Sequence, residues 1–214
     1  MKGLFITIEG PDGAGKTSVL NELYPKLDKV ATQKIVRTRE PGGSLIAEKI
    51  RQIILDPKSN EMDERTEALL YTAARRQHLI EKILPALESG KIVICDRFLD
   101  SSLAYQGAGR RIGVKAIAEI NEFAIEGTVP DFTIYLDVDS DTGLHRIQNS
   151  HRRQFDRLDN AGLEFHQRVR HEYLKLVDEN PQRIVKVDAR MCFKEVVEKT
   201  YYTIVDRFPE YFEN

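Results

Sequence analysis

The stretch Gly10-Pro11-Asp12-Gly13-Ala14-Gly15-Lys16-Thr17 decides how the rest of this sequence is interpreted. It has the pattern G-x-x-x-x-G-K-T, it follows an apolar run at residues 4–8, and a helical pattern begins at Lys16. In such a strand–loop–helix, backbone N–H groups and the positive end of the helix hold phosphate oxygens. The lysine reaches the β- and γ-phosphates, and the threonine hydroxyl binds Mg²⁺. The stretch predicts a nucleoside triphosphate site, with ATP as the expected donor. The residues expected to hold the ATP phosphates are Gly10, Asp12, Gly13, Ala14, Gly15, Lys16, Thr17 and Ser18.

The bulk composition narrows the class of protein. The 214 residues fit one compact domain, or a domain with a small appended lid, expected to span 1–214. With 41% hydrophobic residues the chain can build a core, and its net charge of −2 does not suit a protein that coats nucleic acid. No apolar stretch approaches the length of a membrane span. The two cysteines have no metal-ligand spacing and indicate no disulfide framework, so we expect a reducing, cytoplasmic location.

Apolar strand-like runs alternate with helical patterns along the chain. Strands are expected at residues 4–8, 34–38, 91–95, 132–138 and 183–187, and helices at 16–27, 45–55, 63–87, 112–126, 140–147, 163–177 and 193–208. Pro85 should distort the long helix at 63–87 near its end, and Asp139 or Ser140 should cap the helix at 140–147. The alternation predicts a three-layer α/β fold of the P-loop NTPase type, with a five-stranded parallel sheet flanked by helices.

Magnesium needs oxygen ligands beside the phosphates. Thr17 supplies a hydroxyl, and Asp96 ends an apolar strand at the Walker B position. Glu9, directly before the loop, is a third candidate. The alternatives are a cap or an ion pair with Arg97 for Asp96, and a structural role for Glu9.

The choice among P-loop proteins depends on the remaining motifs. A guanine-reading N-K-x-D does not follow the fourth strand, which argues against a GTPase. The runs Thr38-Arg39-Glu40-Pro41-Gly42-Gly43, Asp96-Arg97-Phe98 and Ser101-Ser102-Leu103-Ala104-Tyr105-Gln106-Gly107 follow the P-loop in order. With these motifs the whole chain resembles the thymidylate kinase family, and most closely its bacterial type. The resemblance implies transfer of the γ-phosphoryl group of Mg²⁺-bound ATP to dTMP, in dTTP biosynthesis, by a homodimer.

The resemblance also implies roles for individual residues. Arg97 would bridge the donor and acceptor phosphates, and Asp12 would contact the 3′-hydroxyl of dTMP. Tyr71, where many relatives have phenylalanine, would stack on thymine, and Arg75 would bond the base edge. Tyr105 would pack near the sugar. The full set implied for dTMP is Asp12, Arg39, Glu40, Arg51, Tyr71, Arg75, Arg97, Ser102, Tyr105 and Gln106.

A polar, arginine-rich segment at about 149–160 lies where nucleotide kinases have a lid. The P-loop has no cationic residue besides Lys16, so the resemblance implies that a lid arginine, Arg153 or Arg152, approaches the γ-phosphate, with Arg157 also in the segment. The implied catalytic set is Lys16, Arg97, Arg153, Arg152 and Asp12, and a weaker adenine set is Arg146, Ala189 and Arg190. Two alternatives stay open: a deoxynucleoside kinase, and a non-enzymatic P-loop regulator that binds a protein partner.

Overall fold

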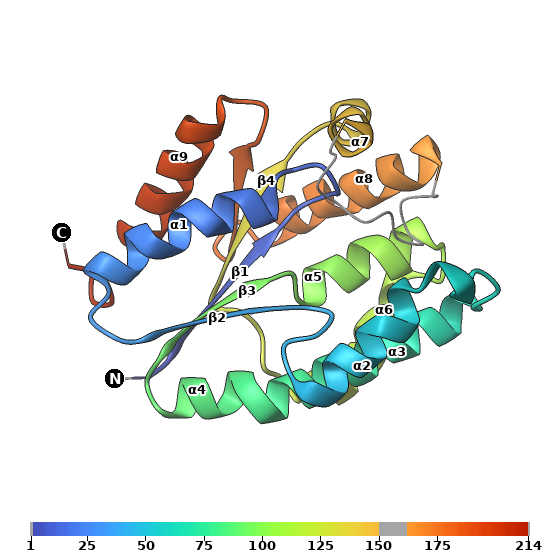
Figure 1. The fold of residues 1–214 in the computed structure, drawn as a ribbon, viewed down its shortest axis with the longest axis horizontal. Coiled ribbons are helices and arrows are strands. Elements are labelled where there is room, and N and C mark those ends of the chain that lie inside the picture. The colour runs from blue at the N-terminus through green and yellow to red at the C-terminus, as the bar shows by residue number, and fades with distance from the viewer. Residues whose placement is uncertain (1, 150–161, 214) are drawn as a thin grey trace.

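The computed structural model describes residues 2–149 and 162–213, which form a central parallel sheet between two layers of helices (Figure 1). The strands are β1 Leu4–Glu9, β2 Ile35–Arg39, β3 Ile92–Asp96, β4 Phe132–Asp137 and β5 Ile184–Asp188, in the order β2-β3-β1-β4-β5. All four strand pairs are parallel. The predicted five-stranded three-layer fold is confirmed. Because β1 is central, the loop after it lies where ligands bind in such sheets.

The helices of the described residues complete the layers. They are α1 Lys16–Val30, α2 Leu45–Leu55, η1 Pro57–Ser59, α3 Glu64–His78, η2 Leu79–Ile83, α4 Leu84–Glu88, α5 Leu99–Ser102, η3 Leu103–Gly109, α6 Val114–Ile125, α7 Ser140–Gln148, α8 Leu163–Glu179 and α9 Phe193–Val205. Figure 1 shows α1 and α9 on one side of the sheet and α4, α5, α6 and α8 on the other. Helices α2 and α3 pack together outside α6.

The alternation of side chains along β1 explains the two layers. Leu4, Ile6 and Ile8 belong to the apolar cluster formed with α1 and α9, whereas Phe5 packs in the cluster on the opposite face. Successive strand residues point to opposite faces. Since helices cover both faces, every residue of the strand is buried, and all are apolar except Thr7 and Glu9.

The long helix expected at residues 63–87 is in fact three segments. An α-helix ends at His78, the π-helical η2 follows, and Pro85 lies in the first turn of α4. Proline lacks the N–H that a helix interior needs, but the first turn does not require it. The distortion expected from Pro85 is therefore present, as a π turn that precedes a short new helix.

Two further differences are local. The buried segment of α5 and the π-helical η3 was not predicted as a helix, because it is covered on nearly every side and shows no amphipathic period. Asp139, not Ser140, caps α7, and its carboxylate accepts from the Thr142 N–H at 2.8 Å. Among the described residues, no helix combines the length and apolar character that crossing a bilayer requires.

Candidate functional site

The glycine-rich loop connects β1 to α1, and Gly13 and Gly15 have positive φ angles of 79° and 83°, which favour glycine. The buried Lys16 ammonium donates to the carbonyl oxygens of Gly10 and Pro11, both at 2.9 Å. Burial, with a smaller effect of the Arg97 charge, lowers the pKa of Lys16 to about 8. The loop thus holds a desolvated cation at the start of α1, where a bound phosphate would restore the charge compensation that water no longer provides.

Two of the three expected magnesium ligands lie together. The Thr17 hydroxyl donates to Asp96 Oδ2 at 3.3 Å. Asp96 Oδ1 is buried, and none of the described residues donates to it. A hydroxyl beside a carboxylate with an unused buried oxygen fits a hard divalent cation that also contacts phosphate.

Glu9 has a different environment from this pair. Its Oε1 accepts from the Phe98 N–H at 2.7 Å, and its Oε2 accepts from the hydroxyls of Ser101 and Tyr173 at 2.6 and 2.8 Å. Burial and the nearby Asp100 charge raise the pKa of Glu9 to about 7. Because both of its oxygens already accept from protein donors, Glu9 anchors the turn after β3. Of the two roles considered for Glu9, these contacts favour the structural one over that of a magnesium ligand.

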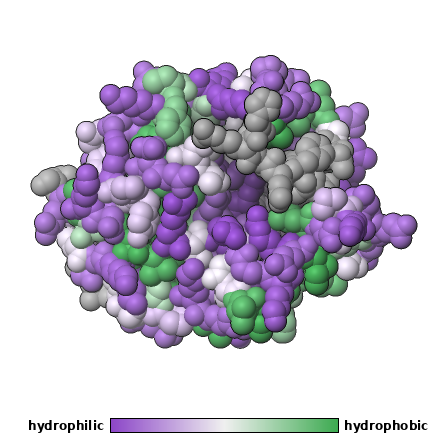
Figure 2. Space-filling model, in the orientation of Figure 1, coloured by the Kyte–Doolittle hydropathy of each residue, from purple (hydrophilic) through white to green (hydrophobic). Residues whose placement is uncertain are grey.

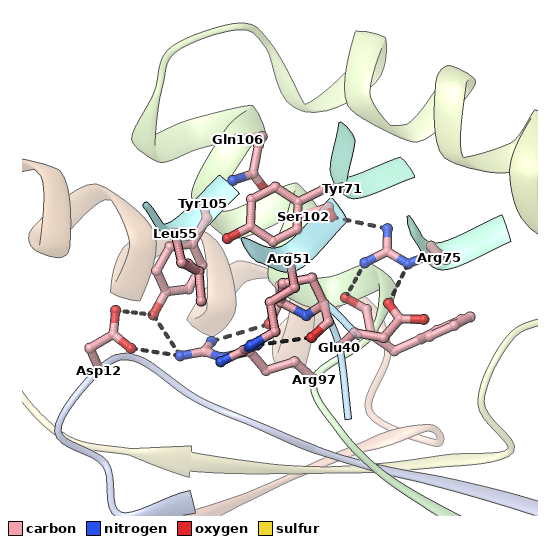
Figure 3. Close-up of a pocket in the computed structure, with 13 residues that line it drawn as sticks. Asp12, Glu40, Arg51, Leu55, Tyr71, Arg75, Arg97, Ser102, Tyr105 and Gln106 are labelled. Atoms are coloured by element: carbon pink, nitrogen blue, oxygen red, sulfur yellow. Dashed lines mark hydrogen bonds and ion pairs between the residues drawn. The ribbon is translucent and has the colours of Figure 1, made fainter. Parts of the chain in front are cut away.

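A pocket opens beside the P-loop, at the carboxyl ends of β1, β2 and β3. Figure 2 shows a hollow near the middle of this face, walled mainly by hydrophilic side chains. Every residue implied for dTMP lines the pocket except Arg39. Figure 3 shows these lining side chains grouped around the pocket. Its lining is Asp12, Glu40, Pro41, Arg51, Leu55, Tyr71, Arg75, Arg97, Phe98, Ser101, Ser102, Tyr105 and Gln106. This lining, in which a few charged and polar groups converge beside aromatic rings, suits a small organic ligand such as a nucleotide.

Asp12, Arg97 and Tyr105 form a cluster between the P-loop and this pocket (Figure 3). The Arg97 guanidinium donates to Asp12 Oδ1 at 2.7 Å, and the Tyr105 hydroxyl donates to Asp12 Oδ2 at 2.9 Å. Arg97 has a left-handed φ of 69°, and its N–H donates to the carbonyl oxygen of Ile8 in β1 at 3.1 Å. The acid inside the P-loop is thus paired with a cation from the turn after β3, which offsets the repulsion between the acid and a phosphate.

Arg75 lies at the opposite end of the pocket and is only 2% exposed. It donates to the Glu40 carboxylate at 2.8 Å, to Ser102 Oγ at 3.0 Å, to the Phe98 carbonyl at 2.9 Å and to Asn121. His78, also buried, contacts Glu40 at 3.0 Å. Glu40 therefore meets Arg75 as a buried ion pair, and Arg75 is fixed before any ligand arrives.

The two remaining arginines of the implied set differ from each other. Arg51 lines the pocket and donates to the Pro41 carbonyl at 2.8 Å. Arg39 is half exposed, pairs with Glu48 at 3.0 Å, and lines a neighbouring hollow together with Thr17 and Asp96. The structure therefore places Arg39 beside the candidate magnesium pair, apart from the other expected acceptor residues.

The weaker adenine set also meets the P-loop. The Arg146 guanidinium donates to Ala189 O at 3.1 Å and to Gly13 O at 3.4 Å. The Arg190 guanidinium forms an exposed ion pair with Asp188 at 2.7 Å. Residues 150–161 lie outside the described part of the chain, and the expectations for Arg152, Arg153 and Arg157 fall there.

Sequence reasoning missed several lining or supporting residues. Phe98 and Ser101 lie inside motifs that had been recognised, so their motif membership was a usable signal. Leu55, His78 and Asn121 carry no motif signal, because they join the site only through packing between distant segments.

Comparison with known proteins agrees with this geometry. The family model described as thymidylate kinase matches residues 8–200. A thymidylate kinase of Enterococcus faecalis is 71% identical over 212 residues, covering 99% of this chain and 100% of that protein. One from Latilactobacillus sakei is 56% identical over 213 residues and covers 100% of both. A crystal structure of thymidylate kinase from Ehrlichia chaffeensis aligns with a TM-score of 0.76 at 33% identity, over 95% of this chain and 99% of that one. The chain belongs to the thymidylate kinase family, and it is an ATP-dependent nucleoside monophosphate kinase.

Proposed function

We propose that this enzyme transfers the γ-phosphoryl group of Mg²⁺-bound ATP to dTMP, which gives dTDP and ADP for dTTP synthesis. The observation that most supports this is the pocket beside the P-loop, whose lining combines arginines, the polar Asp12–Tyr105 pair and the aromatic ring of Tyr71. Such a pocket brings the acceptor phosphate next to the donor phosphates, as transfer requires.

Each part of dTMP has chemically matched partners along the pocket. The Tyr71 ring and the polar groups of Arg75, Ser102 and Gln106 lie at the base end (Figure 3). We assign Tyr71 to stacking on thymine and the other three to its polar edge.

The sugar and phosphate have partners nearer the P-loop. The Asp12–Tyr105 pair suits the deoxyribose, with Asp12 at the 3′-hydroxyl, and Tyr105 packs its ring against Phe165 and Tyr173. Arg51 and Arg97 suit the acceptor phosphate, because the planar guanidinium fork matches phosphate oxygens.

The transfer itself needs positioning and charge neutralisation more than proton abstraction, since a phosphate oxygen is already a nucleophile near neutral pH. Lys16, at the start of α1, and Arg97, after β3, would bring positive charge to the two phosphates. Thr17 and Asp96 would hold Mg²⁺, which supplies neutralisation of the phosphate oxygens when bound. We retain Arg153 or Arg152 as the lid cation and Arg146, Ala189 and Arg190 as the adenine contacts.

We also propose a homodimer formed through α2, α3 and α6. These helices pack on one another and expose large apolar side chains, of which Phe123 on α6 is 87% exposed and Leu45, Ile53 and Leu69 are at least half exposed. Such a gathering of apolar side chains is typical of an interface. Sedimentation velocity should find a dimer that Phe123→Glu converts to monomer, and a wild-type monomer at micromolar concentration would refute the assignment.

We also propose a cytoplasmic location. Its support is that Cys95 and Cys192 are both free thiols, which suits a reducing compartment.

The activity is tested by coupled ADP-release kinetics with ATP, Mg²⁺ and each of dTMP, dUMP, dCMP and thymidine. We expect dTMP to have the highest kcat/KM, and Lys16→Ala to remove turnover as the matched control for contaminating kinases. A preference for thymidine over dTMP would instead favour a deoxynucleoside kinase. Nucleotide binding without transfer to any monophosphate would favour a regulator.

A further inference from the structure

A buried carboxylate on α3, Glu67, lies directly behind the base end of the pocket. Its side chain is 0% exposed, and it is not among the residues that line the pocket. Glu67 Oε1 accepts from the side-chain amide nitrogen of Gln106 at 2.9 Å. Its Oε2 accepts from Arg110 Nη2 at 3.1 Å, so the buried charge is part of an ion pair.

This contact fixes which way the Gln106 amide faces. A carboxylate paired with a guanidinium only accepts hydrogen bonds, so the amide group that faces it has to be the NH₂. The other arm of the amide is then its carbonyl oxygen, and Gln106, which is only 2% exposed, lines the pocket. Figure 3 shows the amide nitrogen of Gln106 turned away from the Tyr71 ring and its oxygen turned toward it.

An amide oxygen facing a pyrimidine distinguishes bases by their ring nitrogen. Thymine and uracil carry a hydrogen on N3 and donate to such an oxygen, whereas N3 of cytosine has only a lone pair. A site built to bond one of these groups rejects the other strongly, because the mismatch leaves buried polar groups unpaired.

We propose that Glu67 is a positioning residue: it holds the Gln106 amide with the carbonyl toward the base, and this orientation makes the pocket select bases that carry N3–H over cytosine. The proposal rests on the proposed function, because it takes Gln106 to contact the base of the acceptor.

The variant Glu67→Gln tests the orientation directly. Arg110 Nη2 bonds Oε2 at 3.1 Å and Arg110 Nε bonds Oε1 at the longer 3.4 Å, so the new amide should keep its oxygen at the Oε2 position. Its NH₂ then faces Gln106, whose amide has to turn and present NH₂ to the base. The ratio of kcat/KM for dTMP to that for dCMP should fall by tenfold or more, on the order of the discrimination that one buried polar contact supplies.

Two further variants separate positioning from a structural role. Arg110→Gln breaks the same ion pair but leaves Glu67 facing Gln106, so it should keep the wild-type dTMP/dCMP ratio. The exchange Glu67→Gln/Gln106→Glu again places one amide opposite one carboxylate, with a carboxylate oxygen toward the base. It should restore thymine preference, and it also tests the idea if Glu67→Gln alone fails to fold.

The outcomes distinguish this inference from the proposed function. If wild-type enzyme does not phosphorylate dTMP, the proposed function fails. If it does, and Gln106→Ala lowers the dTMP/dCMP ratio while Glu67→Gln leaves it unchanged, Gln106 contacts the base without depending on Glu67, which overturns the inference. Equal losses of the ratio in Glu67→Gln and Arg110→Gln, with no recovery in the exchange variant, would likewise reduce Glu67 to a structural role.

Discussion

Replacing Arg75 by methionine should destabilise the enzyme more than a substitution at an ordinary ligand-binding residue. Arg75 and Glu40 form an ion pair of 2.8 Å in which the side chains are 2% and 4% exposed. Removing one partner of such a pair leaves a buried charge without its counter-ion, which costs about 3–5 kcal/mol. The Phe98 carbonyl and Ser102 also lose a donor, while His78 still contacts Glu40 at 3.0 Å and limits the loss. We therefore expect Arg75→Met to cost about 4 kcal/mol of unfolding free energy.

The measurement is equilibrium urea unfolding at pH 7.5. The chain has no tryptophan, so far-UV circular dichroism is the natural signal. Glu40→Gln and the double variant complete a double-mutant cycle, in which the coupling energy isolates the pair. A loss below about 1 kcal/mol for Arg75→Met, the level of an exposed ion pair, would refute the reasoning.

This cost also changes how the base-reading role of Arg75 is tested. Arg75→Ala should weaken dTMP far more than ATP, but an unstable protein would lose both. Arg75→Lys keeps the positive charge near Glu40 and removes the planar fork, so it is the better kinetic variant. A raised KM for dTMP with an unchanged KM for ATP is expected, and equal changes would contradict a base-edge contact.

Three further predictions follow from the P-loop and its neighbours. Lys16→Ala should lower kcat by at least about a hundredfold, because it removes the cation held over the phosphate site, while the circular dichroism spectrum is kept; near-normal turnover would contradict the P-loop assignment. The pKa of Glu9 is raised from 4.5 to about 7, so the folded state binds its proton more tightly and loses stability as the pH rises through this range. Relative to Glu9→Gln, wild-type stability should fall by up to about 3 kcal/mol between pH 5 and pH 8, and parallel urea-unfolding curves would exclude the shift. Gly143→Ala should cost about 1–3 kcal/mol, since its Cβ would lie 2.6 Å from the Asp12 carbonyl oxygen. Gly162→Ala, where no atom of the described residues is within 4 Å of the added Cβ, should change stability little.

The fold was predictable because its signals are local. A buried parallel strand is apolar throughout, and a glycine-rich loop between strand and helix has its own sequence pattern. Segment η3 was not predicted, because it lacks such a local signal. Its seven residues are nearly all buried, so no polar face marks a helical period.

Most residues that line the pocket could be predicted from their motifs, whereas the residues that hold them in place could not. Arg75 was identified from its motif, but its partners Asn121 and Phe98 are 46 and 23 residues away in the sequence. Glu9 was expected to be a magnesium ligand because it precedes the P-loop. Its actual donors, Phe98, Ser101 and Tyr173, come from segments that only the packing of α5 and α8 brings to it.

The acid in the P-loop is paired with Arg97, whose backbone is left-handed. Asp12 would repel the phosphates unless a cation stayed beside it, and Arg97, directly after β3, supplies that cation at 2.7 Å. The guanidinium makes four hydrogen bonds: one of 2.7 Å to Asp12, and three of 3.1–3.2 Å to Gly10, Ser101 and Tyr105. Arginine has five N–H donors, so it cannot contact two phosphates without giving up some of these bonds. The three longer bonds join neutral acceptors and should exchange first, which leaves Arg97 tied to Asp12 while it turns its remaining donors to the phosphates. The Asp12 carboxylate then fixes the position of the Arg97 guanidinium while the guanidinium contacts the phosphates.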